Sequence, residues 1–251
     1  MSNIFDLGGK VAIVTGANTG IGQAIALSLA AAGADIAAVG RTPAEETVEK
    51  VRALGRKAEI VSADLSSIEP VQRVVDETIE KLGGLDILIN NAGIIRRADS
   101  VDFTEEDWDA VIDTNLKSTF FLAQAAGRHM LAQGSGKIVN IASLLSFQGG
   151  IRVPSYTASK SGVAGLTKLL ANEWAAKGVN VNAIAPGYIA TNNTAALQAD
   201  ETRNRQIQER IPAGRWGDPS DIGGAAVFLA SPAANYIHGH VLAVDGGWLA
   251  R

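Results

Sequence analysis

The 251 residues are 47% apolar and 19% charged, enough for one large α/β domain or two small ones with a substantial core. The formal net charge of −4, without a basic block, argues against nucleic acid as the main partner, and the lack of cysteine excludes a disulfide framework and a thiolate metal site, so no metal ligands are expected. No apolar run approaches the roughly 20 residues that span a bilayer, and the N-terminus shows no signal pattern, so we expect a cytoplasmic protein without a membrane partner.

Short apolar, β-branched runs alternate with helical patterns along the chain. Strands are predicted at residues 10–15, 34–39, 59–63, 85–89, 138–142, 179–184 and 240–244. Helices are predicted around residues 23–30, 43–54, 71–82, 104–127 (two helical patterns), 156–177 and 219–230. This alternation predicts a parallel sheet with helices on both faces. The polar, mixed segment 192–217 is predicted to be a mobile substrate lid.

A glycine-rich turn joins the first strand to the first helix, with the sequence Gly16-Ala17-Asn18-Thr19-Gly20-Ile21-Gly22. Glycines let the backbone turn tightly and approach a ligand, and the N-terminus of the following helix offers N–H groups to a pyrophosphate. The spacing is GxxxGxG rather than GxGxxG, and a plain tight turn is the alternative reading. The strand–turn–helix context favours dinucleotide binding.

The end of the second strand, Gly40-Arg41-Thr42, carries no carboxylate. An acidic residue there would bind the 2′-OH of NAD, whereas a nearby arginine accommodates the 2′-phosphate of NADP. Arg41 therefore favours NADP as the cofactor, with NAD possible. Asp64, just past the third strand, is placed either to hydrogen-bond the adenine amino group or to cap the next helix.

The stretch Ser143 to Lys160 carries the candidate chemistry. Tyr156 and Lys160 are four residues apart and would share one face of a helix. An ammonium group near a phenol lowers its pKa from about 10, so that the phenol can exchange a proton near neutral pH. Ser143 follows the predicted strand 138–142, where its hydroxyl would bond the oxygen that Tyr156 protonates. An ordinary surface pair on an amphipathic helix is the alternative, because a two-residue motif is frequent by chance.

Other candidate residues also fall where strands end, at the edge where open α/β sheets bind ligands. Asn90-Asn91-Ala92-Gly93 closes the fourth strand, and Pro186-Gly187 closes the sixth. Asn115, in an apolar helical pattern, is either a satisfied core residue or holds a water that connects Lys160 to solvent.

The loops around this edge fit an anionic, hydroxylated substrate. Arg152 lies four residues before Tyr156, where a guanidinium would clamp a carboxylate with two hydrogen bonds. Further polar candidates at the same mouth are Arg96, Arg97, Gln148 and Asn193. Each of them alone is also compatible with an ordinary solvated loop residue.

Together these residues resemble the classical short-chain dehydrogenase/reductase family. The matching motifs are Thr15–Gly22, Asp64, Asn90–Gly93, Asn115, Ser143, Tyr156–Lys160 and Pro186–Gly187. The resemblance implies one doubly wound, Rossmann-like domain over residues 1–251 with about seven strands, a nicotinamide cofactor, and a catalytic tetrad of Asn115, Ser143, Tyr156 and Lys160. Carried over, Tyr156 is the general acid/base, Ser143 orients the substrate carbonyl, Lys160 lowers the pKa of the phenol and binds the nicotinamide ribose, and Asn115 positions a relay water.

The resemblance also implies the ligand contacts. The cofactor residues are Gly16, Asn18, Thr19, Gly20, Ile21, Gly22, Arg41, Asp64, Leu65, Asn91, Ala92, Gly93, Tyr156, Lys160, Pro186, Gly187, Ile189 and Thr191. The substrate residues are Ser143, Gln148, Arg152, Tyr156, Arg96 and Asn193. A homotetramer is the expected assembly.

Segments 95–97, 146–163, 180–194 and 210–221 are similar to those of family members that act on deoxy sugar acids. The expected reaction interconverts a hydroxyl and a ketone on such an acid by hydride transfer. Two other substrates stay open, gluconate and a 3-oxoacyl chain on a carrier protein. A dinucleotide-sensing protein without turnover is a reading from another class, and the four filled tetrad positions weigh against it.

Overall fold

A seven-stranded parallel sheet runs through the computed structural model, which describes residues 3–251. Its strands are β1 (Val11–Thr15), β2 (Asp35–Gly40), β3 (Ala58–Ser62), β4 (Ile87–Asn90), β5 (Gly136–Ile141), β6 (Val179–Pro186) and β7 (Val241–Val244). They lie in the order β3-β2-β1-β4-β5-β6-β7, and every pairing is parallel. The predicted parallel sheet is confirmed.

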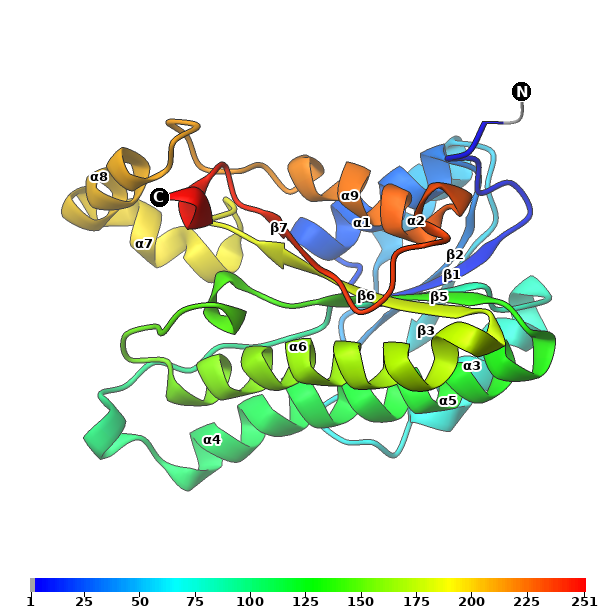
Figure 1. The fold of residues 1–251 in the computed structure, drawn as a ribbon, viewed down its shortest axis with the longest axis horizontal. Helices are drawn as coiled ribbons and strands as arrows, with labels where there is room; N and C mark the ends of the chain where they lie inside the picture. The colour runs from blue at the N-terminus through cyan, green and yellow to red at the C-terminus, as the bar shows by residue number, and fades with distance from the viewer. Residues whose placement is uncertain (1–2) are drawn as a thin grey trace.

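Helices cover both faces of the sheet, as predicted (Figure 1). On one face lie α1 (Gly20–Ala31), α2 (Glu45–Ala53) and α9 (Ser220–Ala230), and on the other lie α3 (Val71–Leu82), α4 (Glu105–Ile112), α5 (Ser118–Gln133) and α6 (Pro154–Trp174). Alternating strand residues supply the two cores: Ala12 and Val14 face one layer, and Val11 and Ile13 face the other. Within residues 3–251, no helix is long and apolar enough to cross a membrane.

The helical pattern over 104–127 is realised as two helices joined by a π-helical turn, Asp113–Lys117. A π-helical turn accommodates one extra residue and is common at functional sites. Here it contains Asn115, which is buried. Helix α6 starts at Pro154, a residue suited to a first helical turn, and ends at Trp174. A 3₁₀ turn continues it to Lys177, and Gly178, with a φ of 82°, ends the helical segment.

Strand order reverses direction at β1. The chain first builds outward from β1 to β2 and β3, and then crosses to the other side of β1 to start β4, so that Val14 pairs with both Ala38 and Ile89. The connections after β1 and β4 leave the sheet in opposite directions, and this opens a crevice at their carboxyl ends. The crevice is where the predicted site residues converge.

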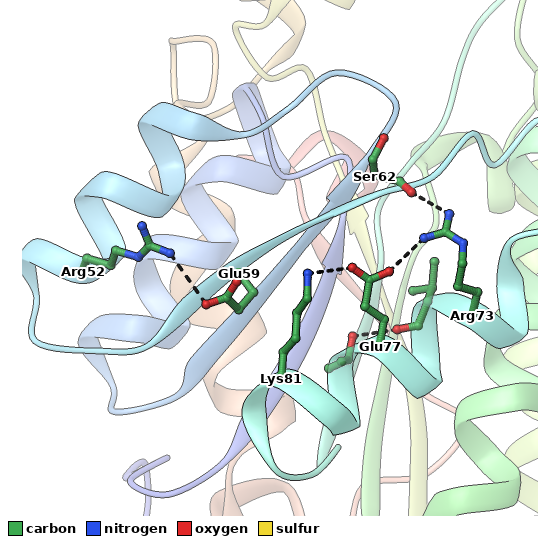
Figure 2. A network of polar contacts seen from close by, with 8 residues as sticks. Arg52, Glu59, Ser62, Arg73, Glu77 and Lys81 are labelled. Atoms are coloured by element: carbon green, nitrogen blue, oxygen red, sulfur yellow. Dashed lines mark hydrogen bonds and ion pairs between the residues drawn. The ribbon is translucent and has the colours of Figure 1, made fainter.

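Charged side chains hold the edge strand β3 against α3 (Figure 2). Arg73 on α3 donates to the Ser62 carbonyl oxygen, the last of β3, at 2.7 Å, and also pairs with Glu77 at 2.8 Å. Lys81 pairs with the same carboxylate at 2.7 Å, and the hydrogen bond from Lys81 is the main reason why the pKa of Glu77 is lowered. The network fixes the end of β3 two residues before Asp64.

The segment 192–217 contains a 3₁₀ turn (Asn192–Thr194) and two helices, α7 (Ala195–Ala199) and α8 (Glu201–Arg210). It lies at the carboxyl edge of the sheet, beside the C-terminal residues (Figure 1). Along α8 only Ile207 is buried, so the segment is joined to the body by little apolar surface.

Candidate active site

A cleft of about 250 Å³ opens at the carboxyl ends of β1 and β4. Twelve of the predicted cofactor residues line it: Gly16, Asn18, Thr19, Gly20, Ile21, Gly22, Asn91, Ala92, Gly93, Tyr156, Lys160 and Thr191. Ile141, Asn192 and Asn193 complete the lining. Arg41, Asp64, Leu65, Pro186, Gly187 and Ile189 lie outside it.

The floor of the cleft has no room for side chains. A Cβ on Gly22 would collide with the Gly16 carbonyl oxygen and lie 2.5 Å from the Asn91 amide nitrogen. Gly16 itself has a φ of 64°, in the region that favours glycine. These two glycines bring bare backbone to the surface of the cleft, as a cradle for a pyrophosphate requires.

The loops after β1 and β4 are tied together through Thr15. Its hydroxyl accepts hydrogen bonds from the backbone N–H groups of Asn91 and Ala92 at 2.9 and 2.8 Å, and the Asn91 side chain donates back to the Thr15 carbonyl oxygen at 2.9 Å. Helix α1 starts beside this junction, and Thr19 at its N-cap makes no side-chain hydrogen bond to the helix. The N–H groups of the first turn of α1 are therefore left to a ligand.

The corner beyond the cleft, where the adenosine end of a dinucleotide would lie, holds Arg41 and Asp64. Their charged groups are 3.9 Å apart, and both side chains are exposed. A hydrogen bond from the Ser66 backbone is the main cause of the lowered pKa of Asp64, with a smaller effect from Arg41. Leu65 is buried next to Asp64. Arg41 is thus free to turn toward an anion at small cost, because an exposed ion pair is weak.

Two of the predicted catalytic residues, Tyr156 and Lys160, line the cleft, and Ser143 lies next to Tyr156. Lys160 is buried, and its ammonium donates to the Ile141 carbonyl oxygen at 2.6 Å, 5.6 Å from the centre of the Tyr156 ring. Ser143 follows β5, as predicted, and its hydroxyl accepts from the Leu145 backbone at 3.2 Å. Ser146 ties the same loop to α6 by donating to the Lys160 carbonyl oxygen at 2.7 Å.

Burial raises the pKa of the Tyr156 phenol, while the Ser143 hydroxyl and then the positive charge of Arg97 act in the opposite direction. Burial also lowers the pKa of Lys160 to about 8. The sequence led us to expect a lowered pKa at Tyr156 with Lys160 as its cause. Desolvation outweighs the nearby charges instead, and Arg97 is the cation that counters it.

Asn115 braces the loop after β4. Its amide oxygen accepts from the Ile94 backbone N–H, and its amide nitrogen donates to the Ile94 carbonyl oxygen, both at 2.8 Å. The same nitrogen lies 3.4 Å from the Ser159 hydroxyl on α6. Asn115 therefore links the π-helical turn, the β4 loop and the catalytic helix. The relay water that was expected at this residue stays a prediction.

Three arginines predicted near the mouth have different partners. Arg96 pairs with Asp107 at 3.1 Å and Arg152 pairs with Asp99 at 3.0 Å. Arg152 also has a φ of 65°, an unusual backbone conformation for a residue other than glycine.

Arg97 has no carboxylate partner among residues 3–251, and its guanidinium donates to the Asn193 carbonyl oxygen at 3.1 Å. It is also the arginine whose charge reaches the phenol of Tyr156. Gln148 faces the C-terminal segment, accepting from the Trp248 indole at 3.3 Å.

Pro186, Gly187 and Ile189 sit at the end of β6. A Cβ on Gly187 would lie 2.6 Å from the Asp245 backbone, so a glycine is needed where β6 and β7 end together. Ile189 is buried and lines a second cavity of about 220 Å³ below the segment 192–217. Two cleft residues, Ile141 and Asn192, were missed. Ile141 acts through its backbone carbonyl, which no side-chain pattern reveals, and Asn192 follows directly after the predicted Thr191.

A family model described as enoyl-(acyl carrier protein) reductase matches residues 16–249. Among curated proteins, the 2-dehydro-3-deoxy-D-gluconate 5-dehydrogenase of Escherichia coli strain K12 is 59% identical over 248 residues, which cover 98% of each chain.

Two solved structures are also similar to this chain. A protein of Agrobacterium tumefaciens, assigned as a 2-deoxy-D-gluconate 3-dehydrogenase and solved with bound NADP, is 62% identical with a TM-score of 0.95, covering 100% of both chains. A gluconate 5-dehydrogenase from Burkholderia cenocepacia J2315, solved with NADP and tartrate, is 40% identical with a TM-score of 0.94, covering 99% of this chain and 98% of the other.

Proposed function

From the premise that the chain belongs to the short-chain dehydrogenase/reductase family, we propose that it is an NADP-dependent oxidoreductase of a deoxy sugar acid. The substrate is of the 2-dehydro-3-deoxy-D-gluconate or 2-deoxy-D-gluconate type, as the names of its relatives suggest. The reaction interconverts a hydroxyl and a ketone. The observation that carries the sugar-acid assignment is Arg97, which has no carboxylate partner in the described part of the chain and whose charge acts on the Tyr156 phenol.

The chemistry follows from the geometry at the inner end of the cleft. In the direction of reduction, the Tyr156 hydroxyl gives its proton to the carbonyl oxygen of the substrate, and Ser143 donates a hydrogen bond to the same oxygen. In oxidation, the phenolate takes the proton back. The Ser143 hydroxyl and the charge of Arg97 favour that phenolate, and the Lys160 ammonium lies 5.6 Å from the centre of the same ring. A bound nicotinamide cofactor supplies or accepts the hydride.

The residues of the cleft fit such a cofactor. Gly16 and Gly22 make the cradle for the pyrophosphate, and Lys160 and Tyr156 are placed for the nicotinamide ribose. Arg41 supports the choice of NADP, because it is an exposed cation at the end of β2, where Gly40-Arg41-Thr42 contains no carboxylate. Both structural relatives described above contain NADP.

Kinetics with both cofactors tests the role of Arg41. A charge-assisted contact to a phosphate contributes roughly 1.5–3 kcal/mol, so Arg41→Ala should reduce the preference for NADP over NAD by about one to two decades. Arg128→Ala, which removes a cation from α5 that bonds only Gln124, is the matched control and should leave the ratio unchanged. An unchanged ratio in Arg41→Ala would show that Arg41 is a surface residue only.

The substrate carboxylate is assigned to Arg97. A guanidinium without a carboxylate partner among residues 3–251 is available to clamp an incoming anion, and its charge acts on the Tyr156 phenol. Asn193 and Gln148 are the candidates for the hydroxyls. Arg152 is the second candidate for the carboxylate, because its bond to Asp99 is an exposed ion pair of small strength.

The decisive experiment compares Arg97→Ala, Arg152→Ala and Arg128→Ala on the keto acid and on its neutral amide or lactone. The variant that lacks the carboxylate-binding arginine should lose about 10²-fold in kcat/KM on the acid and little on the neutral analogue. We expect this of Arg97→Ala. Arg128→Ala should match the wild type on both. Equal losses on both substrates would remove the support for a sugar acid.

Gluconate is the second candidate substrate, because the Burkholderia cenocepacia relative is a gluconate 5-dehydrogenase whose structure holds tartrate, a hydroxylated acid. It presents the same carboxylate to Arg97. Kinetics with a panel of gluconate, deoxy sugar acids and a 3-oxoacyl thioester distinguishes these three candidate substrate classes.

Two further proposals rest on the family. The segment 192–217 acts as a substrate lid, supported by its polar helices and by the bond between Arg97 and Asn193 (hereafter the lid segment). The protein assembles as a homotetramer, and sedimentation velocity tests this directly.

A further inference from the structure

The lid segment rests on a small apolar cluster separate from the two large cores. The buried members are Leu144, Ile207, Ile211 and Trp248, and Tyr188, Leu197, Trp216 and Leu249 pack around them. They come from the loop after β5, the lid segment, the C-terminal turn Trp248–Ala250 and, for Tyr188, the chain just after β6. Since Ile207 is the single buried residue of α8, this cluster is what holds α8 to the body.

Trp248 lies at the centre of this contact. The guanidinium of Arg210, the last residue of α8, lies 3.9 Å from the centre of its ring, and the ring of Tyr188 lies 4.6 Å away. An arginine stacked on an aromatic ring is attracted to it even at partly exposed positions. The indole therefore seats the end of α8 by packing and by charge.

The same indole reaches the catalytic loop. Its Nε1 donates to the Gln148 Oε1 at 3.3 Å, and Gln148 lies five residues after Ser143. With its oxygen engaged, the Gln148 amide has a fixed orientation and presents its NH₂ group as a donor. One side chain thus touches both the lid segment and a predicted substrate residue.

The turn that carries Trp248 is itself rigid. The Asp245 carboxylate accepts from the backbone N–H groups of Gly247 at 2.8 Å and Leu249 at 2.9 Å. Gly246 has a φ of 65°, and a Cβ there would lie 2.9 Å from the Ile211 side chain. The Gly246 carbonyl oxygen also accepts from the Ala213 N–H at 3.0 Å. The C-terminal turn and the end of the lid segment are therefore fitted to each other.

We propose that Trp248 is a positioning residue for the substrate. It orients the Gln148 amide toward a hydroxyl of the sugar acid remote from the reacting carbon, and it seats α8 against the body of the protein. The first part rests on the proposed function, and the second does not. Both parts concern binding of the substrate rather than the proton transfer at Tyr156.

A double-mutant cycle tests the first part. Trp248→Phe keeps an aromatic ring for Arg210 but loses the donor to Gln148, so KM for the sugar acid should rise about three- to tenfold with kcat nearly unchanged. Gln148→Ala should give a similar rise. If Trp248 acts through Gln148, the KM of the double variant should be no higher than that of the more impaired single variant. Multiplying effects, or an unchanged KM in Trp248→Phe, would overturn this part.

Hydrogen exchange on the full-length protein tests the second part without any cofactor or substrate. Trp248→Ala should speed exchange of the α8 amides at least about tenfold, while Trp248→Phe should not. Trp108→Ala, which removes a half-exposed indole from α4, is the matched control and should leave α8 unchanged. Wild-type exchange of α8 in Trp248→Ala would overturn the seating role. If the wild-type enzyme turned over no sugar acid, the proposed function and the role of Gln148 would fall together, and the exchange result would still decide the seating role.

Discussion

Two buried or half-buried lysines lie at opposite edges of the sheet. Lys160, on α6, lies at the carboxyl edge with its ammonium on the Ile141 carbonyl oxygen. Lys137 is the second residue of β5, at the amino edge, and donates to the amide oxygens of Asn180 at 3.0 Å and Asn235 at 2.8 Å. Burial lowers the pKa of each lysine to about 8. By titration alone the two groups are equivalent.

Their surroundings differ. Lys160 lines the cleft and lies 5.6 Å from the centre of the Tyr156 ring, the group proposed to exchange a proton with the substrate. Lys137 contacts two side-chain amides, which do not titrate. It braces β5 to β6 and to the loop before β7. A lowered pKa therefore reports burial, and catalysis requires in addition a partner and a cavity.

Removing the phenol should have the largest effect at the carboxyl edge. Tyr156→Phe deletes the proton donor and leaves the ring in place, so kcat should fall about 10³-fold, within the range of general acid catalysis. The Kd of NADPH, measured by fluorescence titration, should stay within about threefold of the wild-type value. Ordinary turnover by this variant would remove Tyr156 from the mechanism.

Removing the adjacent ammonium should have the second-largest effect on activity. Lys160→Met should lower kcat about 10²-fold and weaken NADPH binding, because the charge serves both the phenol and the ribose. In the wild type, the pKa of Lys160 near 8 means that reduction should slow as the pH rises through about 8, where the ammonium loses its proton. The pH–rate profile of Lys160→Met should lack that step. An identical profile in the variant would assign the step to another group.

The amino-edge lysine should give the smallest effect. Lys137→Met should leave kcat, KM and their pH profiles unchanged, and should alter the free energy of unfolding at pH 7 by no more than about 1 kcal/mol. Because the folded-state pKa of Lys137, about 8, lies below its ordinary 10.5, the unfolded chain binds more protons between these values. The stability of the wild type therefore gains a contribution that rises with pH across this range, and Lys137→Met lacks it. Denaturant titrations at pH 7 and pH 9.5 measure the difference, and a loss of activity would give Lys137 a catalytic role.

The strands, helices and glycine cradle could be predicted because they depend on local patterns: periodicity of two or 3.6, and glycines between a strand and a helix. Ion-pair choice among the arginines could not be predicted. Arg96 and Arg152 find Asp107 and Asp99 through loop conformations that bring distant segments together, and only their geometry leaves Arg97 unpaired.

Backbone acceptors and the C-terminal contact were equally hidden from the sequence. The Ile141 carbonyl that holds Lys160 has no sequence signature, because every residue carries a carbonyl. Trp248 follows two glycines near the end of the sequence, and nothing in that pattern indicates Gln148, one hundred residues earlier, as its partner. Contacts of this kind depend on the completed sheet edge.

The residues proposed for cofactor preference and those proposed for the substrate also lie in different parts of the sequence. Arg41 and Asp64, the residues placed for the adenosine end of the cofactor, precede the Gly83-Gly84 connection, whereas Arg97, Ser143 and Tyr156 follow it. A Cβ on either of these two glycines would meet open space, but Gly83 has a φ of 89°, so a junction between different parents must keep a glycine there. Recombination between two related genes at these codons would exchange the residues proposed for the adenosine end of the cofactor and keep those proposed for the sugar acid.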